Sequence, residues 1–155
     1  MAYILIADDD ELVAEIACRT LTDTGHICGW IANAAQAWDL LHTGRRPDLF
    51  LLDQDMPGMS GMTLLGKLRG SPIHYDLPVV MFTAKTGIED EAQAIHGGAQ
   101  GFVRKPFVPE ILVSRVNQVL AKREEHSRQR DQRTVLAGNG GYARAARMQA
   151  SKLTR

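Results

Sequence analysis

The chain has 155 residues and a formal net charge of zero, with 45% hydrophobic and 23% charged residues. This size and mix are typical of one globular domain with at most a short appendage. No apolar run reaches the ~18 residues that a membrane-spanning helix needs. Cys18 and Cys28 are the only cysteines, which excludes a disulfide scaffold and a four-cysteine zinc site. We therefore expect a reduced, cytoplasmic protein without a membrane partner.

The zero net charge conceals an uneven distribution along the chain. Residues 1–125 hold 11 Lys and Arg against 17 Asp and Glu, a net charge of −6, whereas residues 126–155 hold 7 against 1, a net charge of +6. We expect a folded domain over residues 1–125 and a basic C-terminal extension over residues 126–155. Such an extension can bind an anionic partner or can simply be solvated, and the sequence leaves both readings open.

Five short apolar runs predict the strands of a parallel sheet, because strands buried on both faces are apolar at nearly every position. The runs are Tyr3–Ala7, Ile27–Ile31, Leu49–Leu52, Val79–Phe82 and Gly101–Val103. Amphipathic helical patterns alternate with them. Five β-α units in about 125 residues predict an α/β fold, with a doubly wound parallel sheet covered by helices on both faces.

The helical patterns carry start and stop signals. Asp10, Asn33 and Ser60 are placed to cap the first three helices, which should end near Gly25, Gly44 and Gly70. We expect the fourth helix around Glu89–His96. The fifth includes Leu112 and Val116, is expected to continue into the polar segment after residue 123, and should break at Gly138–Gly141. The short basic segment that follows is expected to be disordered until a partner binds.

Polar residues directly follow four of the apolar runs. Asp8, Asp9 and Asp10 follow the first run, Asp53 the third and Thr83 the fourth, while Lys105 comes two residues after the fifth. The carboxyl ends of parallel strands share one edge of the sheet, where ligands bind near the change in strand order. We therefore expect acids, a hydroxyl and an ammonium group to converge on one small region.

This convergence predicts phosphoryl chemistry on a carboxylate. Asp8, Asp9 and Asp53 would repel one another unless a divalent cation compensates, and all-oxygen ligands favour Mg²⁺ or Mn²⁺. A carboxylate can act as a nucleophile and form an aspartyl-phosphate. The metal ion, the Thr83 hydroxyl and the Lys105 ammonium could each neutralise one phosphoryl oxygen. The sequence thus predicts a site that accepts a phosphoryl group on Asp53.

Four segments resemble the receiver domain of bacterial two-component response regulators. They are ILIADDDE, LFLLDQDMPGMSG, VVMFTA and GFVRKPF, in the family's order and spacing over roughly residues 2–123. The resemblance implies a flavodoxin-like receiver fold with five strands in the order 2-1-3-4-5. It also implies a stand-alone regulator, since too few residues follow for a DNA-binding module.

The resemblance assigns a role to each acid. Asp53 matches the phosphoacceptor, and the position of Asp9 is that of the direct metal ligand. Asp8 would act on the metal mainly through water, and the backbone carbonyl of Asp55 would complete the metal site. We further hypothesise that the side chains of Asp55 and Lys85 pair above the phosphoryl group and hinder its hydrolysis.

The remaining matches concern the switch. Thr83 corresponds to the switch hydroxyl, Phe102 to the switch aromatic, and Lys105 to the lysine that pairs with the phosphoryl group. The bond between Lys105 and Pro106 resembles one that is usually cis in the family. Phosphorylation is implied to draw Thr83 toward the phosphoryl group and to turn Phe102 inward.

The implied function is that of a phosphoacceptor signalling protein in a phosphorelay, not a metabolic enzyme, with self-catalysed phosphoryl uptake and loss. A histidine kinase or a histidine phosphotransfer protein would donate the phosphoryl group. The face made by the fourth helix, fifth strand and fifth helix would then change its protein partners. The sequence does not decide between a monomer and a dimer, and the same face is the expected surface of a homodimer. The downstream target is unknown, and no recognition motif supports nucleic-acid binding by the basic extension, although its charge alone would allow it.

Two alternatives differ in class from this interpretation. A Mg-dependent phosphatase of the haloacid-dehalogenase type also uses Asp, Thr and Lys with acidic metal ligands, and Asp53-Gln54-Asp55 mimics its DxD motif. That family carries its nucleophile on the first strand, whereas here the acidic pair comes first. The second alternative is an unphosphorylated receiver-like interaction module, against which the full set of Asp9, Asp53, Thr83 and Lys105 argues.

Overall fold

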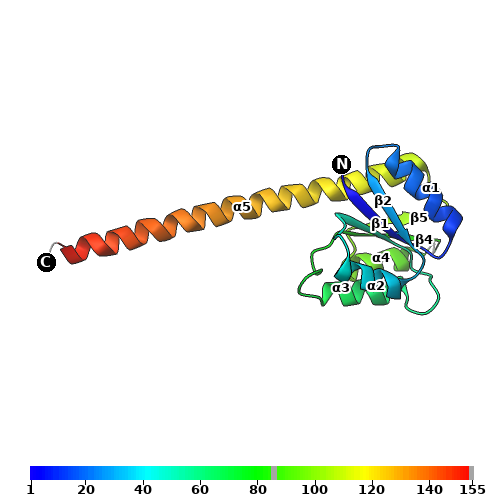
Figure 1. Cartoon of the computed structure of the whole chain (residues 1–155), viewed down its shortest axis with the longest axis horizontal. Helices are drawn as coiled ribbons and strands as arrows, with labels where there is room; N and C mark the ends of the chain where they lie inside the picture. Colours follow the sequence, from blue (N-terminus) through cyan, green and yellow to red (C-terminus); the bar gives the residue numbers. More distant parts are fainter. Residues whose placement is uncertain (85–86, 154–155) are drawn as a thin grey trace. The chain divides into compact units, whose positions relative to one another are not determined.

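The computed structural model describes residues 1–84 and 87–153, with side chains described up to residue 137. Within these residues five strands alternate with five helices (Figure 1). The strands are β1 (Tyr3–Ala7), β2 (Ile27–Ile31), β3 (Leu49–Leu52), β4 (Val79–Thr83) and β5 (Gly101–Arg104). The helices are α1 (Glu11–Thr22), α2 (Ala34–Thr43), α3 (Gly61–Arg69), α4 (Ile88–His96) and α5 (Pro109–Leu153).

The five strands form one parallel sheet in the order β2-β1-β3-β4-β5. β1 pairs with β2 on one side and with β3 on the other, and Ala7 lies opposite both Ile31 and Leu52 at the carboxyl ends. The predicted doubly wound fold and its strand order are therefore confirmed. All five strands point the same way, so the residues that follow β1, β3, β4 and β5 emerge at one edge.

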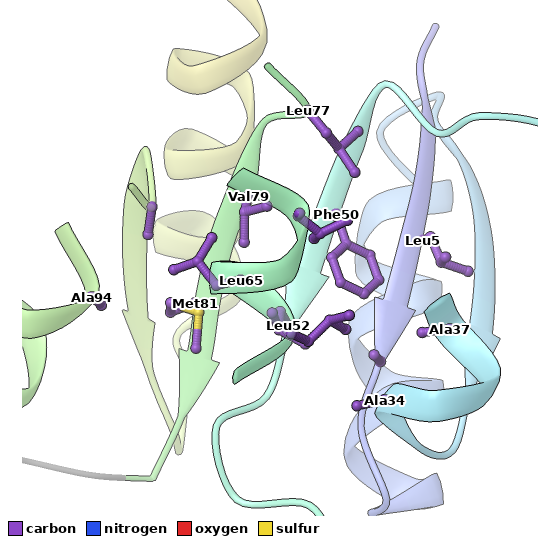
Figure 2. Close-up of a cluster of buried hydrophobic side chains, with 14 of the residues drawn as sticks. Leu5, Ala34, Ala37, Phe50, Leu52, Leu65, Leu77, Val79, Met81 and Ala94 are labelled. Atoms are coloured by element: carbon purple, nitrogen blue, oxygen red, sulfur yellow. The ribbon is translucent and has the colours of Figure 1, made fainter. Parts of the chain in front are cut away.

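Each face of the sheet packs against its own set of helices, because alternate residues of a strand point to opposite faces. Leu5, Phe50 and Met81 face α2, α3 and α4 (Figure 2). Ile6, Leu51 and Phe82 face α1 and the first turns of α5. The central strands β3 and β4 are buried at every position, which is why their sequences read as unbroken apolar runs.

The predicted caps close the amino ends of the first three helices. The side chain of Asp10 accepts a hydrogen bond from the Val13 backbone N–H (3.2 Å), Asn33 accepts one from Gln36 (2.8 Å), and Ser60 one from Thr63 (3.2 Å). Each supplies a partner for a backbone donor that the helix itself leaves unpaired. As a result, the observed starts of these helices agree with those read from the sequence.

The predicted break at Gly138–Gly141 is wrong, because α5 runs as one helix from Pro109 to Leu153. Glycine lowers helix stability by about 1 kcal/mol relative to alanine but can still adopt helical dihedral angles. Alanine and arginine, both strong helix formers, are frequent just after the glycines.

The chain divides into two compact units, Met1–Leu120 and Ala121–Arg155, and a distinct role for residues 126–155 stays a prediction. Among the described residues, none of the helices combines the length and hydropathy of a membrane span.

His74 is a buried residue of the α3–β4 connection that the sequence did not single out. It is 2% exposed, and neither ring nitrogen has a hydrogen-bond partner among the described residues. Its ring meets that of His42 edge-on with centroids 4.9 Å apart, near the ion pair of Arg46 and Asp76 (2.7 Å). Burial lowers the pKa of His74, His42 and Arg46 lower it further, and Asp76 opposes them.

We expect this lowered pKa to make the fold less stable in mild acid. As the pH falls through the unfolded-state value of 6.5, the unfolded chain takes up a proton on His74 that the folded chain refuses. Urea unfolding at about pH 7.5 and about pH 5.5 measures the loss in unfolding free energy. The loss should be smaller in His74→Phe than in wild type, whereas His96→Gln, at an exposed position, should match wild type. An equal loss in all three proteins would show that protonation of His74 is not the cause of the lower stability in acid.

Candidate functional site

The carboxyl edge of the sheet gathers three carboxylates that the sequence predicted to meet. One oxygen each from Asp8, Asp9 and Asp53 lies within 4.8 Å of the others. Asp8 and Asp53 are 0% and 3% exposed, whereas Asp9 is exposed to solvent. Three carboxylate oxygens at this spacing, with one group open to solvent, fit a hard divalent cation such as Mg²⁺ or Mn²⁺.

Lys105, the residue directly after β5, brings a positive charge into the same cluster. Its Nζ donates to the Asp8 carboxylate and lies 3.6 Å from an Asp53 oxygen. The Lys105 backbone N–H donates to the Thr83 carbonyl (2.9 Å), which ties the residue to the end of β4. The peptide bond between Lys105 and Pro106 is cis, as the resemblance implied. The lysine is thus held beside the two buried acids that most need a counter-charge.

Asp53 has a strongly perturbed acidity. Burial raises the pKa of its carboxyl group to about 6. Lys105 acts in the opposite direction, Asp8 raises the pKa further, and a hydrogen bond from the Asp55 backbone N–H lowers it. Burial is the largest of these effects, and Lys105 offsets it only in part because its ammonium group is shared between Asp8 and Asp53. Such a carboxyl group, with its shift set by burial and specific charges, is typical of a functional site.

The Asp8 segment is held in place by hydrogen bonds from three directions. Its backbone N–H donates to the Ile31 carbonyl (3.1 Å), its carboxylate accepts from the Asp10 backbone N–H (2.9 Å), and its carbonyl accepts from Trp30 Nε1 (2.8 Å). The sequence analysis did not predict the hydrogen bond from Trp30 to Asp8. Trp30 precedes the last residue of β2, and that position could have indicated that its side chain lies near the acids, since β2 ends at the same edge of the sheet.

The loop after Asp53 returns at once to the start of α3. Gln54 accepts two hydrogen bonds there, from the Gly61 N–H to its carbonyl (3.1 Å) and from the Met62 N–H to its side chain (2.6 Å). A Cβ at position 61 would lie 2.2 Å from the Asp53 carbonyl oxygen, so only glycine fits. This close approach fixes the backbone on both sides of the Asp53 carboxylate.

Thr83 and Phe102 belong to the adjacent strands β4 and β5. Thr83 is the buried last residue of β4, and Phe102 pairs in register with Met81. Both line one small cavity with Gln54 and Met62. Phe102 is only 7% exposed. Its role as the switch aromatic, and that of Thr83 as the switch hydroxyl, stay predictions.

The sequence also predicted roles near the site for Asp55 and Lys85. Asp55 lies beside the site, with an exposed side chain and a backbone N–H directed to Asp53. The role of its carbonyl as a metal ligand stays a prediction. Lys85 falls outside the described residues, so its pairing with Asp55 remains a hypothesis.

Comparison with known proteins gives one consistent family. The family model of the response regulator receiver domain matches residues 4–117. The phosphate regulon transcriptional regulatory protein PhoB of Pseudomonas aeruginosa is 36% identical over 119 residues, which are 77% of this chain and 52% of PhoB. The chemotaxis protein CheY homologue of Campylobacter jejuni is 31% identical over 118 residues, covering 76% of this chain and 91% of the homologue.

Solved structures agree with the sequence relatives. The chemotaxis protein CheY4 of Vibrio cholerae superimposes with a TM-score of 0.70 at 28% identity, over 77% of this chain and 98% of that one. The chain spans about half the length of PhoB. These findings do not favour the haloacid-dehalogenase alternative. With the matched region covering both the fold and the acidic edge, the chain belongs to the response regulator receiver domain family.

Proposed function

We propose that this chain is the phosphoacceptor of a two-component phosphorelay and that Asp53 carries the phosphoryl group. The supporting observation is the meeting of a buried Asp53 carboxylate with Lys105 Nζ at 3.6 Å and with two further acids within 4.8 Å. The donor is a phosphohistidine on a histidine kinase or a histidine phosphotransfer protein. We also propose a cytoplasmic location.

The chemistry is a direct transfer between two side chains. An Asp53 oxygen attacks the phosphorus, the bond from phosphorus to the donor imidazole nitrogen breaks, and the imidazole leaves with the electron pair. Asp9, Asp53 and the Asp55 carbonyl would hold Mg²⁺, the metal that receiver domains generally use, with Asp8 acting through water. The bound ion would neutralise phosphoryl charge. Lys105 would turn from Asp8 toward a phosphoryl oxygen, and the Thr83 hydroxyl would donate to another.

Thr83 and Phe102 would transmit the effect of phosphorylation from Asp53 to the protein surface. Because both line the same small cavity, a shift of Thr83 toward the phosphoryl group changes the space beside the Phe102 ring. The neighbouring surface of α4, β5 and the start of α5 exposes Ile88, Ile95 and Ile111. We propose this surface as the place where a downstream protein or a second copy binds in the phosphorylated state.

The test is uptake of one phosphoryl group from a small donor. Wild-type protein with Mg²⁺ and a phosphoramidate should gain one phosphoryl group by intact mass, and chelation of the metal should prevent the gain. Asp53→Asn should gain none, whereas Asp39→Asn, an exposed acid on α2, should behave as wild type.

Two other outcomes would contradict the proposal and favour a different function. Absence of any gain in wild type would favour the unphosphorylated interaction module. Repeated turnover of a small phosphomonoester would favour the phosphatase.

A further inference from the structure

The two cysteines of the chain lie side by side at the margin of the core. Cys18 is on α1 and Cys28 is on the edge strand β2, and their Sγ atoms are 2.8 Å apart. Both are free thiols of intermediate exposure, packed against the hydrophobic cluster that α1 and α5 share. Neither belongs to the phosphoryl site described above.

The surrounding structure holds the two thiols against each other. Ala17, the neighbour of Cys18, is fully buried against the sheet, and Cys28 pairs in register with Ile4 of β1. The two sulfur atoms therefore meet as a consequence of how α1 packs on the sheet. A bond length of about 2.05 Å requires only a small further approach of the sulfur atoms.

The two thiols differ in acidity in a way that sets an order of reaction. A hydrogen bond with Cys28 lowers the pKa of Cys18, with burial in opposition. The same hydrogen bond raises the pKa of Cys28, and burial adds to the effect. Since the thiolate is the reactive form of cysteine, these opposite directions favour Cys18 as the thiol that attacks an oxidant.

We propose that Cys18 and Cys28 are a redox-active pair that closes to an intramolecular disulfide when the protein meets a peroxide. The Cys18 thiolate attacks one peroxide oxygen, the O–O bond breaks, and a sulfenic acid and one water form. Cys28 sulfur then attacks the Cys18 sulfur, a second water leaves, and the S–S bond forms. Overall, one peroxide is reduced to two waters and two thiols are oxidised to one disulfide.

The bond would join α1 directly to the edge strand β2. It would close a short loop, since the two residues are 10 positions apart, and would limit the freedom of the unfolded chain. We expect the oxidised protein to melt several degrees higher than the reduced protein. Dithiothreitol should reverse both the bond and the shift in melting temperature.

The experiment uses the full chain, purified with reductant, freed of it and treated with hydrogen peroxide. Maleimide labelling in denaturant should tag both cysteines before treatment, neither after treatment, and both again after dithiothreitol. A proteolytic digest should contain one peptide pair joined through Cys18 and Cys28. Two thiols still labelled after treatment, or thiols lost only to intermolecular cross-links or to sulfinic acid, would overturn the proposal.

Single-cysteine variants test the order of attack. Cys28→Ser should accumulate a sulfenic acid on Cys18 that dimedone traps. Cys18→Ser should react with peroxide more slowly than Cys28→Ser, because burial still raises the pKa of Cys28. The variants lose their hydrogen-bonded partner, so the same comparison is made in wild type by brief alkylation, which should modify Cys18 before Cys28. Preferential alkylation of Cys28 would overturn the assignment of Cys18 as the attacking thiol.

Discussion

Replacing Lys105 with alanine is expected to slow phosphoryl transfer to Asp53 by on the order of 100-fold, the usual effect of removing one charge-stabilising donor from a reaction site. Lys105 Nζ contacts Asp8 and lies 3.6 Å from Asp53. No other cation among the described residues is paired with either acid. The phosphoryl oxygens would lose their ammonium partner, and Asp8 and Asp53 would be left to repel each other. Initial rates of intact-mass gain from a phosphoramidate at fixed Mg²⁺ measure the effect.

Two further variants separate this role from a general loss of positive charge. Lys67→Ala removes a lysine on α3 that lies over the Trp38 ring, away from the acids, and should leave the rate unchanged. Lys105→Arg keeps the charge but not the compact ammonium group, and should fall between wild type and Lys105→Ala. A Lys105→Ala protein that is folded by circular dichroism yet phosphorylated at the wild-type rate would remove Lys105 from the mechanism.

Replacing Asp53 with asparagine is expected to stabilise the metal-free protein at neutral pH. With a pKa raised from 3.8 to about 6, the folded chain holds a proton on Asp53 through a range in which the unfolded chain has lost it. Stability therefore falls as the pH rises from about 4 to about 6, by on the order of 3 kcal/mol, and then stays level. Asparagine does not ionise, so it should recover most of that loss.

Urea unfolding at about pH 7.5 in the presence of a chelator measures this gain. The gain should shrink when saturating Mg²⁺ is added, because the ion stabilises only a folded chain that has the Asp53 carboxylate. Asp39→Asn supplies the matched change at an exposed position. If Asp53→Asn were less stable than wild type without metal, Asp53 would contribute to the fold as an ordinary buried acid. The ionised Asp53 carboxylate would then not be a destabilising group that a bound Mg²⁺ ion stabilises.

Much of this fold could be predicted from local patterns in the sequence. The runs at Tyr3–Ala7, Ile27–Ile31 and Leu49–Leu52 coincide with the observed strands, and the other two strands each extend one residue further. Continuous apolarity works as a signal here because helices cover both faces of the sheet. The meeting of Asp8, Asp9, Asp53 and Lys105 followed from strand direction alone, without any knowledge of side-chain positions.

Two kinds of feature could not be predicted from the sequence. One is the set of contacts between helices and strands that are distant in the chain, and the other is whether residues with a weak helix preference break a helix. The hydrogen bond from Trp30 to the Asp8 carbonyl and the burial of His74 against His42 depend on packing between segments that are distant in the chain. The pairing of Cys18 with Cys28 depends on the rotation of α1 about its axis. The glycines at Gly138–Gly141 disfavour a helix by modest amounts, which the rest of α5 outweighs.

The proposed function depends on a divalent cation bound beside Asp53 at the sheet edge, and calorimetric titration of Mg²⁺ into the unphosphorylated protein measures that binding. Wild type should bind one ion, and Asp9→Asn should lose that binding because an exposed member of the carboxylate cluster is gone. Asp10→Asn removes a neighbouring acid that only caps α1, and should bind as wild type does. Equal Mg²⁺ binding by Asp9→Asn and wild type, or none by wild type, would rule out this metal site.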